Sequence, residues 1–166
     1  PELDRLRPPA SEPPESLHRA MLYSTLAPGK RLRATLAVAG CEAAGGDGER
    51  ALPLGAAIEM IHAYSLIHDD LPAMDDDDWR RGQPSCHRAF GEGMAILAGD
   101  ALQTLAFEVV AELPRLCGIR ADTALSIARV LARAAGSRGM AGGQAADLEA
   151  VGRAIDARAL EFVHRH

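Results

Sequence analysis

The sequence has few aromatic residues, few cysteines and no long apolar run. Phe, Trp and Tyr make up 4% of its 166 residues, a composition that favours close packing of small-residue helices. Cys41, Cys86 and Cys117 are scattered, with no Cys-x-x-Cys pair, which indicates reduced, buried thiols of a cytoplasmic protein. No apolar run approaches the length of a transmembrane helix. The first residues do not resemble a signal peptide, and without an initiator Met the chain is expected to have been trimmed.

Basic residues are fewer than acidic residues. With 23 acidic and 18 basic residues the net charge is -5, which gives no electrostatic reason to expect nucleic-acid binding. We therefore expect a cytoplasmic protein that binds neither nucleic acid nor a membrane. Lysine is the scarcest basic residue, because Lys30 stands alone beside 17 arginines. A compact ammonium acts as a point charge on phosphate, and we interpret Lys30 as a phosphate-binding residue.

Helical periodicity, interrupted by Gly and Pro, runs through the chain, and no segment has a convincing strand period. We expect an irregular Pro-rich leader over 1–14, followed by helices over about 15–26, 30–44, 52–70, 93–113, 122–135, 143–148 and 156–166. Asp122 and Asp156 are expected to cap the helices that follow them. The buried stripe of the 93–113 helix is predicted to comprise Met94, Leu97, Ala101, Leu105, Val109 and Leu113. Leu125, Ala128, Leu131 and Ala135 should share one face of the next helix. The predicted fold class is an all-α helical bundle.

Six carboxylates fall within the ten residues 69–78, at and just beyond the end of the 52–70 helix, and Arg80 and Arg81 follow them. Asp69 and Asp70 end the helix, because Pro72 disfavours helical geometry in the residue before it. Clustered carboxylates repel one another unless a cation lies among them. Mg²⁺ is commonly held by one or two carboxylates together with substrate phosphates, and arginines suit phosphate oxygens. The segment therefore predicts a site for a metal-chelated polyphosphate.

Two simpler interpretations of the acidic segment compete with this one. A run of Asp is often only a solvated loop, but the apolar helix before it and the two arginines after it argue against that. An EF-hand calcium loop opening at Asp75 would place Arg80 at the glycine position and Cys86 at the terminal glutamate. The sequence therefore excludes this form of calcium site.

The acidic segment, Asp-Asp-x-x-x-x-Asp followed by Arg-Arg-Gly, resembles the first aspartate-rich motif of the trans-isoprenyl diphosphate synthases. Further stretches match this family in its order, at 29–33, 59–62, 80–87, 98–102 and 143–148. The resemblance covers the chain from about Leu22 to its end. It implies that 15–166 is the N-terminal half of a single prenyltransferase domain, a helical bundle of the isoprenoid synthase type that is incomplete in this chain. The family continues with a Lys-Thr pair and a second aspartate-rich motif. Residues 1–166 alone are therefore expected to be inactive and poorly folded.

The resemblance also implies a reaction and the residues that carry it. The family catalyses a Mg²⁺-dependent head-to-tail (1'-4) condensation of isopentenyl diphosphate with an allylic diphosphate, dimethylallyl or geranyl, usually as a homodimer. Asp69 and Asp75 match ligands of Mg²⁺, for which Mn²⁺ could substitute. Asp70 matches a further catalytic position in the motif. Arg80 matches the contact to the allylic diphosphate, and Gln144, with Asp147 close by, matches a position near the same substrate. The residues that match the isopentenyl diphosphate site are Lys30, Arg33, His62 and Arg81.

Product length is assigned to Tyr64, with Ser65 beside it. Tyr64 precedes Asp69 by five residues, about 7.5 Å along a helix, where a growing isoprenoid tail would point. In the resembled family an aromatic residue at this place accompanies short products, and the pattern here is most similar to bacterial farnesyl diphosphate synthases. A geranyl or geranylgeranyl product is the alternative to farnesyl. For Tyr64 itself, the alternative is a core residue that has no role in product length. A non-catalytic partner subunit or a diphosphate-binding module is the competing class of function.

Overall fold

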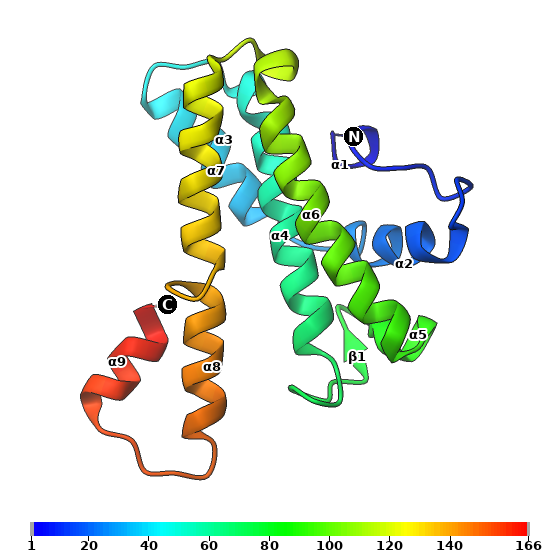
Figure 1. Ribbon diagram of the computed structural model, residues 1–166, viewed down its shortest axis with the longest axis vertical. Helices are drawn as coiled ribbons and strands as arrows, with labels where there is room; N and C mark the ends of the chain where they lie inside the picture. The colour runs from blue at the N-terminus through cyan, green and yellow to red at the C-terminus, as the bar shows by residue number, and fades with distance from the viewer. Residues whose placement is uncertain (1, 166) are drawn as a thin grey trace. The chain divides into compact units, whose positions relative to one another are not determined.

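The computed structural model describes residues 2–165, which form helices joined by short loops and fall into two compact units that divide after Ala121 (Figure 1). The all-α prediction is confirmed, apart from one small hairpin. The first unit contains α1 (Glu2–Arg5), α2 (Glu15–Thr25), α3 (Leu32–Ala43), the 3-10 helix η1 (Gly48–Ala51), α4 (Leu52–Asp69), β1 (Trp79–Arg80), β2 (Gln83–Pro84), α5 (Cys86–Phe90) and α6 (Glu92–Cys117). The short elements α1, η1, α5 and the β1–β2 hairpin were not predicted, because none spans enough residues to show a period.

The core of the first unit lies between α4 and α6, which run alongside one another (Figure 1). From α4 the largest fully buried side chains are Met60 and Ile67. The buried residues of α6 are Ala95, Ala98, Gly99, Leu102, Ala106, Val109, Val110, Leu113 and Cys117. Of the predicted stripe only Val109 and Leu113 are buried, since Leu97 is 54% exposed whereas Ala98, outside the stripe, is fully buried. Small residues face α4 because they allow the two backbones to approach closely.

One close approach in this core depends on Gly99 of α6. A Cβ atom there would lie 2.2 Å from Nε2 of His68 on α4, so only glycine leaves room for the imidazole. His68 Nε2 donates to the carbonyl oxygen of Ile96, 3.1 Å away. On its other side the His68 ring contacts the ring of Tyr64 edge to face, with centroids 5.9 Å apart. His68 thus links the two helices.

The helix α6 is also long and apolar enough to cross a membrane by length and composition alone, which corrects the expectation that no segment meets that test. No uninterrupted apolar run of that length occurs in α6, but its charged residues are few and scattered, so its average composition is apolar. Its buried face packs along α4, as expected for the central helix of a bundle.

The second unit starts at Asp122 and contains α7 (Ala121–Ala135, apart from its first residue), α8 (Met140–Ala150) and α9 (Ala157–Arg165). Asp156 caps α9 as predicted, because its Oδ1 atom accepts from the amide of Ala159 at 2.8 Å. Asp122 instead lies inside the first turn of α7. Leu125, predicted to share one face of this helix with Ala128, Leu131 and Ala135, is 72% exposed. The predicted end of the last helix at His166 lies outside the described residues.

Candidate functional site

The site is built around the C-terminal end of α4, where the chain turns through 70–78 into the β1–β2 hairpin (Figure 1). The two predicted metal ligands are held close by the backbone, because the amide of Asp75 donates to the carbonyl oxygen of Asp69 at 2.8 Å. Burial raises the pKa of the Asp69 carboxyl, and the negative charges of Asp75 and Asp70 raise it further, against the opposing charge of Arg80. A cation between Asp69 and Asp75 would relieve this repulsion.

The carboxylates at this site suit Mg²⁺ and do not form a complete metal cage. Within residues 2–165, no group of three or more His, Cys, Asp or Glu side chains is arranged to hold a metal ion. Mg²⁺ keeps several of its water molecules and is usually bound through one or two carboxylates and substrate phosphates. Asp69 and the exposed Asp75 supply such a partial, oxygen-only ligand set.

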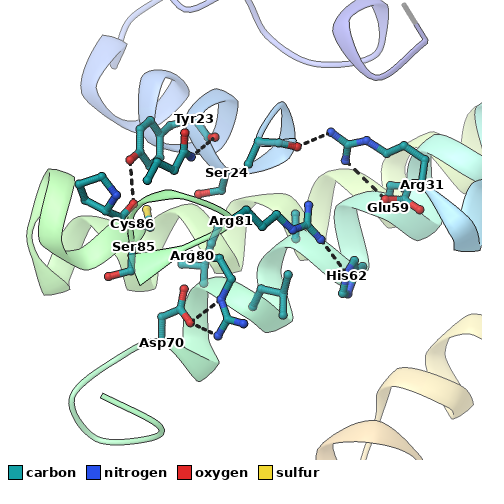
Figure 2. Close-up of a pocket in the computed structure, with 16 residues that line it drawn as sticks. Tyr23, Ser24, Arg31, Glu59, His62, Asp70, Arg80, Arg81, Ser85 and Cys86 are labelled. Atoms are coloured by element: carbon teal, nitrogen blue, oxygen red, sulfur yellow. Dashed lines mark hydrogen bonds and ion pairs between the residues drawn. The ribbon is translucent and has the colours of Figure 1, made fainter. Parts of the chain in front are cut away.

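Asp70 has surroundings quite different from those of Asp69. It is 2% exposed, and its Oδ1 atom accepts hydrogen bonds from both Nε, at 2.9 Å, and Nη2 of Arg80 (Figure 2). Arg80 Nη2 also contacts Oδ2 of Asp77 at 3.2 Å. The hydrogen bond with Asp70 raises the pKa of Arg80. Asp70 thus orients Arg80, while a third of the Arg80 side chain stays open to a ligand.

Arg81, the next residue, points in another direction, toward His62 of α4 (Figure 2). Its φ of 55°, followed by 83° at Gly82, makes the tight turn between β1 and β2. Arg81 Nη2 donates to Nε2 of His62 at 3.2 Å. A Cβ atom at Gly29 would lie 2.6 Å from Arg81 Nη1, so the glycine before Lys30 leaves space for this guanidinium.

His62 lies among positive charges. Burial lowers its pKa, and the charges of Arg33 and Arg81 lower it further. The ring is therefore neutral near pH 7 and can accept the hydrogen bond from Arg81. Lys30 and Arg33 are exposed on the loop and the first turn of α3. The structure thus places Arg33, His62 and Arg81 in one electrostatic neighbourhood, and Lys30 stands in the loop that precedes α3.

Behind the hairpin is a small pocket of about 30 Å³ between α2, α4 and the hairpin, with room for about two water molecules. Its lining includes Glu59, His62, Asp70, Arg80 and Arg81, so it lies among the candidate site residues and against the hairpin. Tyr23 of α2 donates from its hydroxyl to the carbonyl of Pro84 at 2.7 Å, and Gln83 Nε2 donates back to the carbonyl of Tyr23 at 3.4 Å. These contacts hold the arginine-bearing hairpin against α2 (Figure 2).

Tyr64, the predicted chain-length residue, is 8% exposed and lies against His68. Burial raises the pKa of its phenol, although a hydrogen bond with Gln103 of α6 opposes this. Ser65 donates to the carbonyl of His62 at 3.0 Å. Gln144 and Asp147 lie on α8, in the second unit. The roles assigned to Tyr64, Ser65, Gln144 and Asp147 remain predictions.

One residue with no assigned role in the sequence analysis lies at the edge of this site. Glu59 of α4 is 4% exposed, and it contacts Arg31 and the start of α3. The available signal was an acidic residue in an otherwise apolar segment of α4, one turn before His62. Its place in a family-like stretch was recognised, but its structural partners could not be read from the sequence.

The comparisons with known proteins agree with this architecture. Residues 14–165 match the family model described as polyprenyl synthetase. The chain belongs to the polyprenyl synthetase family, whose members have the all-α isoprenoid synthase fold.

Individual relatives are prenyl diphosphate synthases. The chain is 50% identical to a farnesyl diphosphate synthase of Geobacillus stearothermophilus, over 93% of this chain and 52% of that protein. It is 48% identical to geranylgeranyl pyrophosphate synthase 7 of Arabidopsis thaliana, over 92% of this chain and 44% of that protein. Among solved structures, an FPP/GFPP synthase from Zymomonas mobilis superposes with a TM-score of 0.90 at 44% identity, covering 97% of this chain and 58% of that one. The chain thus spans about half the length of the curated relatives it matches.

Proposed function

We propose that the full-length protein is a prenyltransferase that condenses isopentenyl diphosphate with an allylic diphosphate, head to tail, and releases pyrophosphate. The observation that carries the proposal is that two neighbouring arginines contact different groups at the end of α4. Arg80 lies beside the metal-type carboxylates, whereas Arg81 turns to His62 and the cations of the 29–33 loop. Two neighbouring diphosphate sites of different character suit a reaction with two diphosphate substrates.

On the allylic side the chemistry is the loss of pyrophosphate from a primary carbon. Mg²⁺ held by Asp69 and Asp75 would neutralise the charge that develops on the leaving pyrophosphate. Arg80, already oriented by Asp70 and Asp77, would hold the same phosphate oxygens. A donor fixed before the reaction needs no reorganisation as charge develops, and such preorganisation is a large part of electrostatic catalysis.

On the other side, the proposed ligands of isopentenyl diphosphate are Lys30, Arg33, His62 and Arg81. They bind its diphosphate without metal-type carboxylates among them, which suits a substrate whose carbon–oxygen bond to the diphosphate stays intact. The double bond of this substrate attacks the allylic carbon, a new carbon–carbon bond forms, and loss of a proton from the resulting cation gives the product.

Farnesyl diphosphate is the proposed product. Tyr64 is buried on α4, five residues before Asp69, and the Geobacillus relative is named for this product. Geranylgeranyl diphosphate is the second possibility, because the Arabidopsis relative is nearly as similar. We place the working enzyme in the cytoplasm as a homodimer that binds neither nucleic acid nor membrane.

The proposal is tested by incubating the full-length protein with labelled isopentenyl diphosphate, dimethylallyl or geranyl diphosphate and Mg²⁺, followed by chromatographic sizing of the products. Wild-type protein should give a C15 product, with turnover lost on chelation and restored by Mg²⁺ or Mn²⁺. Asp69→Ala should lower turnover by orders of magnitude, whereas Asp76→Asn should change it little. A protein that binds isopentenyl diphosphate but forms no product would instead be a non-catalytic partner subunit or a diphosphate-binding module.

A further inference from the structure

Glu59 is a buried acid that has no part in the chemistry described above. It lies among the buried residues of α4, with 4% of its surface exposed. Burying a carboxylate costs several kcal/mol unless it is paired or hydrogen-bonded. An acid also weakens the positive potential that would attract a diphosphate to His62, three residues further along α4. Its presence therefore calls for a compensating structural role.

The first partner of Glu59 is the start of α3. Glu59 Oε1 accepts from the amide of Ala34 at 3.1 Å, the third residue of that helix. The first amides of a helix have no partner inside the helix, and a carboxylate there also complements the helix dipole. The approach is close because Gly55 of α4 faces Ala34, where an added Cβ atom would lie 3.2 Å from the alanine methyl. Glu59 thus takes the place of an N-cap side chain for α3.

The second partner is Arg31, in the loop between α2 and α3 (Figure 2). Glu59 Oε2 lies 3.5 Å from Arg31 Nη1, and Arg31 Nη2 donates to the carbonyl of Ala27 at 2.9 Å. The backbone of Arg31 is left-handed, with a φ of 49°, a conformation that is unfavourable for a residue other than glycine. The ion pair and the hydrogen bond hold the residue in that conformation. Glu59 thereby fixes both the loop and the helix that follows it.

We propose that Glu59 is a positioning residue that sets the affinity for isopentenyl diphosphate by fixing the backbone on which Lys30 and Arg33 stand. These two cations flank Arg31 in the sequence, so the conformation of Arg31 decides where both of them point. The same α4 helix carries His62, so Glu59 ties the loop cations to the helix that supplies the other half of the site. This inference rests on the proposed function. Glu59 itself, buried and negative, does not touch the substrate.

The test uses steady-state kinetics of the full-length protein with each substrate varied in turn. Glu59→Ala should raise the KM for isopentenyl diphosphate about tenfold or more, equivalent to about 1.4 kcal/mol, with kcat and the KM for the allylic substrate changed less than about threefold. Glu59→Gln should have a smaller effect, because its amide oxygen can still accept from Ala34. Glu49→Ala, which removes an exposed acid of η1, is the matched control and should behave like wild type.

Arg31→Ala provides a second route that leaves the buried position intact. It should raise the same KM, and the double variant Arg31→Ala/Glu59→Ala should be less impaired than the sum of the two, as expected for residues that act through one contact. An unchanged KM for isopentenyl diphosphate in folded Glu59→Gln and Arg31→Ala would overturn the inference. So would a uniform loss of kcat with both KM values rising together, since a general structural defect predicts that result.

Titration calorimetry with isopentenyl diphosphate separates this inference from the proposed function. A wild-type protein that binds the compound without turning it over refutes the proposed enzyme, and weaker binding by Glu59→Ala would still support the positioning role. Equal affinities of wild type and Glu59→Ala refute the positioning role alone. A wild-type protein that does not bind the compound refutes both.

Discussion

Asp69 and Asp70 are adjacent in the sequence, yet their neutralisation should have different effects on folding. Asp70 is buried and supports Arg80, so Asp70→Asn leaves a guanidinium with a weaker partner. Removing one member of a buried ion pair costs about 3–5 kcal/mol. Arg80 keeps 32% of its side chain exposed and retains Asp77, and the amide oxygen of Asn can still accept. We therefore expect a loss of about 2 kcal/mol in the free energy of unfolding, near the range for hydrogen bonds to charged groups.

Asp69→Asn should cost little or be slightly stabilising, by up to about 0.5 kcal/mol, in the absence of Mg²⁺. Its folded-state pKa is raised, so the folded protein binds a proton more readily than the unfolded chain. Stability then falls as the pH rises from 3.8 through the raised value, and at pH 7.5 the ionised Asp69 imposes its full cost. Asn removes that cost.

Urea unfolding of the full-length variants at pH 7.5 with a chelator measures both effects. Asp76→Asn is a suitable control, because Asp76 is exposed with a φ of 53° that Asn tolerates. If Asp69→Asn destabilises as much as Asp70→Asn, the assignment of Asp69 as a ligand under repulsion and of Asp70 as a support for Arg80 is wrong.

Two further predictions concern α4. Tyr64→Ala should lengthen the product by at least one isoprene unit and cost about 3 kcal/mol of stability, whereas Tyr64→Phe should leave the product unchanged. Chromatography of the products measures both effects on length. An unaltered product length in active Tyr64→Ala would mean that Tyr64 is only a core residue. Because the pKa of His62 is lowered, its contribution to stability is present above pH 6.5 and lost as the pH falls through the lowered value. The stability difference between wild type and His62→Gln should therefore shift against wild type between pH 7.5 and 5.5 in urea titrations, and a constant difference would contradict a neutral, buried imidazole.

The long helices could be predicted from sequence because periodicity and Gly/Pro interruptions are local signals. α4 was expected to reach about Asp70 and ends at Asp69. The packing face of α6 could not be predicted in the same way. A Leu-rich and an Ala-rich stripe are both compatible with its period, and the choice depends on how closely α4 approaches, which is a tertiary property. The periodicity therefore favours Leu97 for the stripe, whereas in the structure Leu97 is exposed and Ala98 is buried.

The sequence indicates which residues belong to the candidate site more fully than it indicates how they are arranged. The carboxylates, the two arginines and His62 were found because clustered charge and a family-like motif identify them. Their pairing was not visible, since Asp70 to Arg80 and His62 to Arg81 span 10 and 19 residues. The left-handed backbones of Arg31 and Arg81 also carry no sequence signal, because neither position is glycine. Predicting the supporting role of Glu59 requires both the pairing of residues distant in the sequence and the backbone conformation of Arg31.

The missing side chain at Gly99 also affects how product length could be altered. The imidazole of His68 occupies the space beside Gly99, and the ring of Tyr64 contacts this imidazole. The position of the Tyr64 ring on α4 therefore depends on α6. If Tyr64 limits the growing chain, a methyl group added at 99 would shift this limit through His68. Selection or engineering could then adjust the length of the product through a helix that carries none of the substrate ligands proposed above.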